Sequence, residues 1–143
     1  MQRETALLLA YKLLYKPYYW GGNDPMQGFD CSGFIIELLK SVGILPPKGD
    51  WTANDLADKW PESAEVKPGC LVFWDWNKDG IVDHVEIVIE VDPGGLVFTI
   101  GASGGGAATL SVGDAILQDA YIKMRPMRSD HYSIVDPFAG SFA

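Results

Sequence analysis

The chain has 143 residues, of which 48% are hydrophobic and 21% are charged, and its formal net charge is −8. This length and apolar content fit a single domain over residues 1–143 whose core needs neither disulfides nor a metal for stability. The negative charge argues against nucleic acid or an anionic membrane as partner, and no apolar run reaches the roughly 18 residues of a membrane span.

The first predicted element is a helix over Glu4–Lys16, which Pro17 ends. The apolar stretch at 5–14 has some features of an export signal. It is short, it carries Lys12 and it lacks a small-residue cleavage site, so we interpret it as a helix and expect no signal peptide. The apolar face of this helix, at helical spacing, consists of Ala6, Leu9, Ala10, Leu13 and Leu14.

Two further helices are predicted before residue 61. The longer one covers Cys31–Val42, with Gly43 as its C-terminal glycine. Asp30 stands just before it, where a carboxylate can cap free N–H groups. The shorter helix begins after Thr52, and Asp55 completes a weak form of capping box.

After Pro61 the apolar pattern changes to the period of β-strands. The turn at 92–95 predicts a hairpin, so its two flanking strands are expected to be antiparallel. Helices followed by an antiparallel sheet make an α+β fold. Residues 128–143 lack a pattern and are expected to drape over the surface. The predicted strands are Cys70–Trp74, His84–Val91, Leu96–Ile100, Ala107–Val112 and Ala120–Met124.

The two cysteines have different expected roles. Cys70, at the start of a strand, is expected to be a small buried hydrophobic residue. Cys31 begins a helix, where the helix dipole and the free N–H groups favour a thiolate and lower the thiol pKa. The neighbouring carboxylate of Asp30 raises the thiol pKa, so a histidine has to compensate for it.

His84 is the better candidate base of the two histidines in the chain. It opens a predicted strand, whereas His131 lies in the unpatterned tail and is expected to be a surface residue. A helix-end thiolate and one imidazole are the minimum for nucleophilic catalysis by cysteine. His84 would accept the thiol proton and later give it to the leaving amine, and a third polar group normally fixes such a ring.

Four motifs resemble the NlpC-type cell-wall cysteine peptidases, a papain-like family. They are PYYWGG at 17–22, GFDCSGF at 28–34, KPGCLVF at 67–73 and DHV at 83–85. The resemblance implies a papain-like α+β domain, with N-terminal helices packed on an antiparallel sheet. It implies Cys31 as nucleophile, His84 as base and Tyr18 as a hydroxyl that helps backbone N–H groups hold the oxyanion. The implied substrate is an amide bond of a peptidoglycan stem peptide.

The third catalytic position departs from the family pattern. The family usually carries histidine, asparagine or glutamine where this chain has Gly101, which has no side chain. Thr99 lies two residues earlier on the same strand face and is predicted to orient His84 instead. A backbone carbonyl or a water molecule is the alternative. Near the nucleophile, the residues predicted to contact substrate are Trp20, Asp30 and Ser32.

Residues 75–86 match the calcium-loop pattern D-x-[DN]-x-[DN]-G-x5-E. A structural Ca²⁺ here would hold the strand that carries His84, although the chemistry itself needs no cofactor. The alternative is an acidic β-turn between two strands, and a strand after the loop would turn Glu86 away from the ion. The predicted ligands are side-chain oxygens of Asp75, Asn77 and Asp79, the carbonyl of Ile81 and, through water, Asp83.

The sequence thus predicts a monomeric cysteine peptidase or amidase that acts on peptidoglycan. A bare catalytic domain without an evident export signal suits a phage-encoded lysin or tail peptidase, and it suits equally a domain cut from a larger protein. Two alternatives stay open. One is a catalytically impaired wall-binding module, which the missing side chain at Gly101 motivates. The other is a thiol amide hydrolase with a non-wall substrate.

Overall fold

The computed structural model describes residues 1–18, 23–24, 28–105 and 109–139. Within these ranges, no helix is long and apolar enough to cross a membrane. The helices are α1 (Gln2–Lys12), α2 (Cys31–Ser41), α3 (Ala53–Lys59) and α4 (Val112–Gln118). The strands are β1 (Asn23–Asp24), β2 (Gly28–Phe29), β3 (Leu71–Trp74), β4 (His84–Val91), β5 (Val97–Ser103), β6 (Tyr121–Pro126) and β7 (Ser133–Val135).

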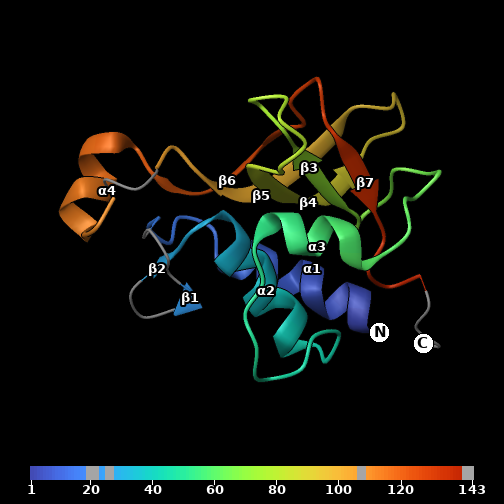
Figure 1. Cartoon of the computed structure of the whole chain (residues 1–143), viewed down its shortest axis with the longest axis horizontal. Coiled ribbons are helices and arrows are strands. Elements are labelled where there is room, and N and C mark those ends of the chain that lie inside the picture. The colour runs from blue at the N-terminus through green and yellow to red at the C-terminus, as the bar shows by residue number, and fades with distance from the viewer. Residues whose placement is uncertain (19–22, 25–27, 106–108, 140–143) are drawn as a thin grey trace.

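The fold is the expected α+β arrangement of helices on an antiparallel sheet (Figure 1). Five strands form the main sheet in the order β6-β5-β4-β3-β7, and β1 pairs with β2 in a separate small ribbon. Helices α1, α2 and α3 lie on one side of the main sheet, whereas α4 projects beyond its end (Figure 1). The predicted hairpin is confirmed, since β4 and β5 pair antiparallel with Ile87 opposite Ile100.

Helix α2 is the central element of the core. It is capped as predicted, because the carboxylate of Asp30 accepts a hydrogen bond from the Gly33 N–H at 2.7 Å. The predicted capping box of α3 is also present, with Thr52 and Asp55 bonded reciprocally. The buried side chains of α2 belong to Phe34, Ile35, Ile36, Leu38 and Leu39.

Strand β3 is buried on both faces. Leu71 and Phe73 belong to the main core beneath the helices. Val72 and Trp74 belong to a smaller cluster on the other face, together with Cys70, which is 0% exposed as predicted. Because both faces of β3 are packed in this way, the sheet forms a fixed platform for its neighbour β4.

Helix α1 is shorter than predicted, because it ends at Lys12 rather than Lys16. Tyr15 adopts a left-handed conformation, with φ +70°, and the chain then runs beside β6. There Tyr15 N–H donates to the Ile122 carbonyl, and Ile122 N–H donates to the Lys16 carbonyl, both at 2.9 Å. Pairing with a distant strand therefore overrides the helical pattern of the last turn.

The strand predicted at 107–112 is wrong over its described residues, 109–112. Residue 112 instead begins α4, and Ser111 caps this helix by accepting a hydrogen bond from Asp114 N–H at 3.1 Å. A side-chain cap outweighs the strand preference of one β-branched residue. The strand predicted over Ala120–Met124 is confirmed as β6.

Within the described part of the C-terminal segment, residues 133–138 belong to the core rather than to a surface tail. Its strand β7 pairs with β3 at the edge of the sheet, and Phe138 is only 3% exposed. Asp136 is buried and forms ion pairs with Arg3 at 3.0 Å and Lys67 at 3.5 Å. A strand of three residues is too short to show a period, which is why the sequence pattern missed it.

Replacing Asp136 with alanine is expected to lower the free energy of unfolding by about 2 kcal/mol, the usual range for a hydrogen bond to a charged group. Burial raises the pKa of this carboxyl, but the hydrogen bond and charge of Arg3 outweigh burial and lower the pKa below its usual value. Its contribution is therefore present near neutral pH and is lost as the pH falls through the lowered pKa.

Urea unfolding measured at pH 7 and pH 3 checks this expectation. Asp58, an exposed residue of α3, supplies the matched control Asp58→Ala, which should unfold like the parent protein. A midpoint for Asp136→Ala equal to that of Asp58→Ala at pH 7 would contradict the expected role of the buried carboxylate.

Candidate active site

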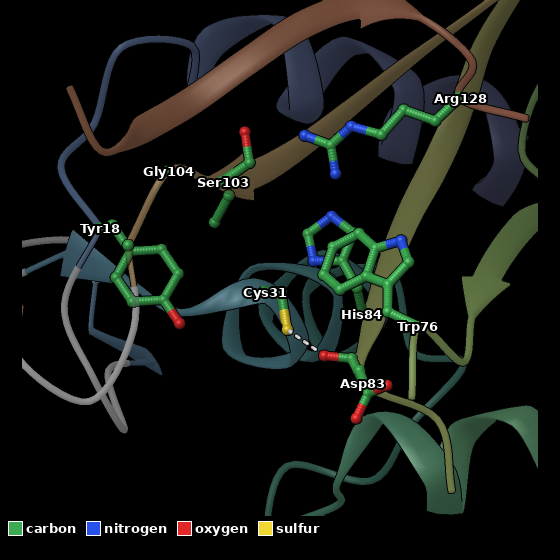
Figure 2. Close-up of a pocket in the computed structure, with 10 residues that line it drawn as sticks. Tyr18, Cys31, Trp76, Asp83, His84, Ser103, Gly104 and Arg128 are labelled. Atoms are coloured by element: carbon green, nitrogen blue, oxygen red, sulfur yellow. Dashed lines mark hydrogen bonds between the residues drawn. The ribbon is translucent and has the colours of Figure 1, made fainter. Parts of the chain in front are cut away.

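Cys31 is the first residue of α2 and faces a pocket of about 350 Å³ (Figure 2). The cap made by Asp30 fixes the start of the helix and therefore the place of the thiol. The thiol donates a weak hydrogen bond to the Asp83 carbonyl, with a sulfur–oxygen distance of 3.9 Å. Tyr18, Trp76, His84, Ser103 and Arg128 line the same pocket.

His84 is the first residue of β4, where it pairs with Trp74 of β3. Its side chain is buried, and two aromatic rings hold it. Trp76 stacks on the imidazole with ring centroids 5.0 Å apart and an interplanar angle of 18°. Trp74 lies tilted at 5.7 Å. The predicted nucleophile and the predicted base thus share one pocket, although they lie far apart in the chain.

Glu86 is the hydrogen-bond partner of the His84 ring. It is not among the active-site residues that the sequence predicts. The imidazole Nε2 lies 2.7 Å from Glu86 Oε2. Residues two apart on a strand lie on the same face, so the run His84-Val85-Glu86 contained the signal. The calcium-loop pattern instead makes this glutamate the last residue of an ion site.

The prediction that Thr99 itself contacts and orients the His84 ring is wrong. Thr99 lies opposite Val88 in the pairing of β5 with β4, and its hydroxyl donates to Glu86 Oε1 at 2.5 Å. Thr99 therefore contacts the carboxylate and not the imidazole. The strand-face argument is correct, but the register of the two strands brings Glu86 between them.

The pKa values favour a protonated resting thiol and an ionised Glu86. Burial, with a further contribution from Asp30, raises the pKa of Cys31 to about 12. The expected lowering by the helix end is thus outweighed by desolvation. Burial also raises the pKa of Glu86, but the hydrogen bond and charge of His84, with Thr99 and Arg128, lower it below its usual value overall.

Tyr18 lines the same pocket as Cys31 and lies across it from His84 (Figure 2). Its backbone N–H donates to the Ala120 carbonyl at 2.9 Å, and its side chain is buried. Burial, with the charges of Cys31 and Asp30, raises its pKa. The phenol therefore keeps its proton and can act as a donor to an oxyanion.

Of the three residues predicted to contact substrate, the two that are described, Asp30 and Ser32, do not line the pocket. Trp20 lies outside the described residues. Asp30 and Ser32 interact with each other and with the start of α2, since Ser32 Oγ lies 3.4 Å from Asp30 Oδ1. Among the described residues that line the pocket, neither of these two is present, so contact with substrate stays a prediction.

In the loop at 75–83, the aspartate carboxylates accept hydrogen bonds from backbone N–H groups of the same loop. Asp75 accepts hydrogen bonds from the N–H groups of Gly80 at 2.7 Å and Asp79 at 3.3 Å. Asp79 accepts one from Ile81, and Asp83 accepts one from Asn77. Glu86, the last position of the motif, points to His84. Over the described part of the chain, no group of three or more histidine, cysteine, aspartate or glutamate residues is arranged to hold a metal.

Calcium binding to this loop stays a prediction, and chelation tests it. If an ion holds the loop, excess EGTA is expected to lower both the melting temperature and the activity, because the loop leads directly into His84. Added Ca²⁺ should restore both. An unchanged melting temperature and unchanged turnover in EGTA would contradict calcium and leave the acidic turn as the explanation.

Comparison with known proteins gives a consistent family signal. The model of the NlpC/P60 family matches residues 15–133. The chain is 43% identical over 79 residues to murein DD-endopeptidase MepH of Escherichia coli, covering 52% of this chain and 28% of that protein. It is 34% identical over 87 residues to the bifunctional muramidase/DL-endopeptidase CwlT of Bacillus subtilis, covering 60% and 26%. The chain thus spans about a quarter of the length of these relatives.

Solved structures agree on the fold. The NlpC/p60 domain of the peptidoglycan hydrolase SagA superposes with a TM-score of 0.64 at 25% identity, covering 94% of this chain and 97% of that one. RipD of Mycobacterium tuberculosis, a non-catalytic NlpC/p60 domain protein adapted to peptidoglycan binding, superposes with a TM-score of 0.63 at 14% identity, covering 94% and 96%. A shared fold therefore does not decide between catalysis and binding, and the side chains in the pocket have to.

Proposed function

The chain belongs to the NlpC/P60 family, and from this membership we propose that it is a cysteine peptidase that hydrolyses amide bonds in peptidoglycan stem peptides. Relatives named as murein endopeptidases support the substrate class. The observation that carries the proposal is the pocket that Cys31 and His84 share. A thiol at a helix start beside a buried, partnered imidazole is the arrangement that nucleophilic catalysis by cysteine requires.

The reaction proceeds through a thioester. Because Nε2 of His84 is bonded to Glu86, Nδ1 takes the proton from the Cys31 thiol. The thiolate attacks the amide carbonyl, and Tyr18 with backbone N–H groups stabilises the oxyanion. The C–N bond then breaks as the imidazolium protonates the leaving amine. Water attacks the thioester, His84 accepts its proton, and the carboxylic acid leaves as the thiol is restored.

The raised thiol pKa makes His84 essential to this scheme. An isolated thiol with a pKa of about 12 contributes almost no thiolate at neutral pH. Transfer of its proton to His84 creates a thiolate–imidazolium pair instead, and the buried carboxylate of Glu86 stabilises the imidazolium. Stabilisation of the Cys31 thiolate thus depends on His84 and Glu86 rather than on the helix end.

The wall-binding alternative is suggested by the non-catalytic structural relative RipD, but this pocket supports it less than catalysis. In the sequence, it is suggested by the absence of a third polar side chain at Gly101. The contact of His84 with Glu86 at 2.7 Å supplies such a group from another position. Catalysis is therefore the function that the pocket favours, while the monomeric state and a phage origin stay predictions from the sequence.

Product analysis on purified muropeptides tests the proposal. The expected result is one new amine and one new carboxylic acid for each stem peptide cleaved, and the position of the cut identifies the bond. Binding to the wall without new termini would support the wall-binding module. Cleavage of unrelated peptides or amides, but not of muropeptides, would support a non-wall substrate.

A further inference from the structure

Gly101 lies beside Glu86 across the pairing of β5 with β4, one step beyond Ile100 opposite Ile87. A Cβ atom at Gly101 would overlap Glu86 Cγ and would stand only 3.0 Å from Glu86 Cδ. Such close approaches are not tolerated by real side chains without displacement. The stem of Glu86 therefore fills the space that any side chain at position 101 would need.

The carboxylate of Glu86 is held on all sides, and its side chain is only 1% exposed. One oxygen lies 2.7 Å from His84 Nε2 and 4.0 Å from a nitrogen of Arg128. The other oxygen accepts the hydrogen bond of Thr99 at 2.5 Å. A buried charge with a partner for each oxygen is held in place, so a side chain at Gly101 could be admitted only by breaking these contacts.

We propose that Glu86 is the positioning residue of His84, and that glycine at position 101 is the feature that makes room for it. The third polar group then comes from the strand of the histidine itself rather than from the neighbouring strand. Glu86 holds the ring so that Nδ1 faces the thiol, and its charge stabilises the imidazolium. This inference rests on the proposed role of Cys31 and His84, although it does not depend on the substrate.

A purely structural role for Glu86 is the alternative, and the pH dependence of thiol reactivity separates the two. The charged and titratable groups that face the pair are Cys31 from α2, Tyr18 across the pocket, Asp83 before β4, Arg125 of β6, which lies opposite Thr99, and Arg128 after β6. None of these is changed in the variants below. A structural defect lowers stability without changing the shape of the pH profile, whereas loss of the positioning carboxylate changes that shape.

The first experiment measures alkylation of Cys31 by iodoacetamide between pH 5 and pH 9, with peptide mapping. We expect Glu86→Ala to react about 100-fold more slowly than the parent protein at pH 6, and Glu86→Gln about 10-fold more slowly. The introduced amide would keep a hydrogen-bond acceptor but not the charge. In both variants the rate should rise steadily with pH, because an unpaired thiol remains. The control Glu90→Ala, at an exposed site of the same strand, should match the parent.

The second experiment tests the role of Gly101 by a double-mutant cycle with the same readout. Gly101→Ala alone should slow alkylation at pH 6 about as much as Glu86→Ala, because the new Cβ displaces the carboxylate. In the Glu86→Ala background the same change should have little further effect, since the Cγ and Cδ atoms that the new Cβ would meet are gone. Melting temperatures verify that every variant is folded.

A Glu86→Ala profile that overlays the parent profile would overturn the inference, as would additive losses in the cycle. Neither measurement uses the wall. If the parent shows the expected alkylation profile but does not cleave muropeptides, the proposed substrate fails and the role of Glu86 stands. If muropeptides are cleaved equally well by the parent and by Glu86→Ala, the proposed function stands and the role of Glu86 fails.

Discussion

Replacing Cys31 with alanine is expected to reduce the hydrolysis of purified peptidoglycan by at least about 10⁴-fold, because the reaction loses the atom that forms the covalent bond. Binding and the oxyanion donors survive, so a small residual rate over water is consistent with the scheme. The fold should be preserved, since alanine is a good helix former and the cap made by Asp30 does not use the thiol. Release of new amino groups from purified wall measures the effect.

The matched control is Cys70→Ala. Cys70 is fully buried in the smaller cluster, at the opposite end of β3 from Trp74 and His84, and it does not line the pocket. Its replacement should lower the melting temperature through a small cavity while the turnover of the folded protein is kept. Hydrolysis by Cys31→Ala at a rate near that of Cys70→Ala would end the assignment of Cys31 as nucleophile.

Replacing His84 with glutamine is expected to lower wall hydrolysis by about 10³-fold or more, because one residue serves as both base and acid. It should also change the pH dependence of Cys31 alkylation. Without an imidazole to take the proton, the raised pKa of about 12 governs the thiol. Below that pKa the thiol is protonated and inert, so the rate should rise roughly tenfold per pH unit through the neutral range.

His131→Gln is the control for this variant, because His131 is exposed and outside the pocket. It should leave both the turnover and the alkylation profile unchanged. If His84→Gln were alkylated at pH 6 as fast as the control, the thiol would be activated by something other than His84. The proposal that Cys31 and His84 form a thiolate–imidazolium pair would then have to be abandoned.

The elements that carry the proposed nucleophile and the proposed base were predictable from local signals. Asp30 caps α2 directly before Cys31, so the start of that helix can be recognised from a few residues. The strand β4 begins at His84 as predicted, because its apolar run is bounded by a turn on each side. Both signals lie close in sequence to the residue that they position, and long-range contacts do not override them.

The role of Glu86 was not predictable in the same way. The spacing of His84 and Glu86 places both side chains on one strand face, but the room for the carboxylate depends on which residue of β5 lies opposite Glu86. That register cannot be predicted from either strand alone. The absence of a side chain at Gly101 looks, in the sequence, like a missing catalytic group. In the structure it is the space that another residue fills. A sequence pattern that treats each position separately shows only that a side chain is missing at position 101.

The resting state of the thiol differs from the prediction for an energetic reason. A helix end contributes a modest stabilisation of an anion, whereas desolvation of a buried ionised group is larger. The sequence shows the helix end but not how strongly the surrounding pocket shields Cys31, which is only half-buried, from water. The same reasoning explains the C-terminal segment, where burial of Asp136 and Phe138 follows from pairing of β7 with β3 rather than from any period in the tail.

Titration of the thiol against activity is the most direct test of the central claim. Samples are alkylated at pH 6 to graded extents, the modified fractions of Cys31 and Cys70 are counted by mass spectrometry, and muropeptide cleavage is measured on the same samples. We predict that cleavage falls in proportion to the unmodified fraction of Cys31 and reaches zero while Cys70 is still intact. Cleavage that persists after Cys31 is fully alkylated would contradict the account.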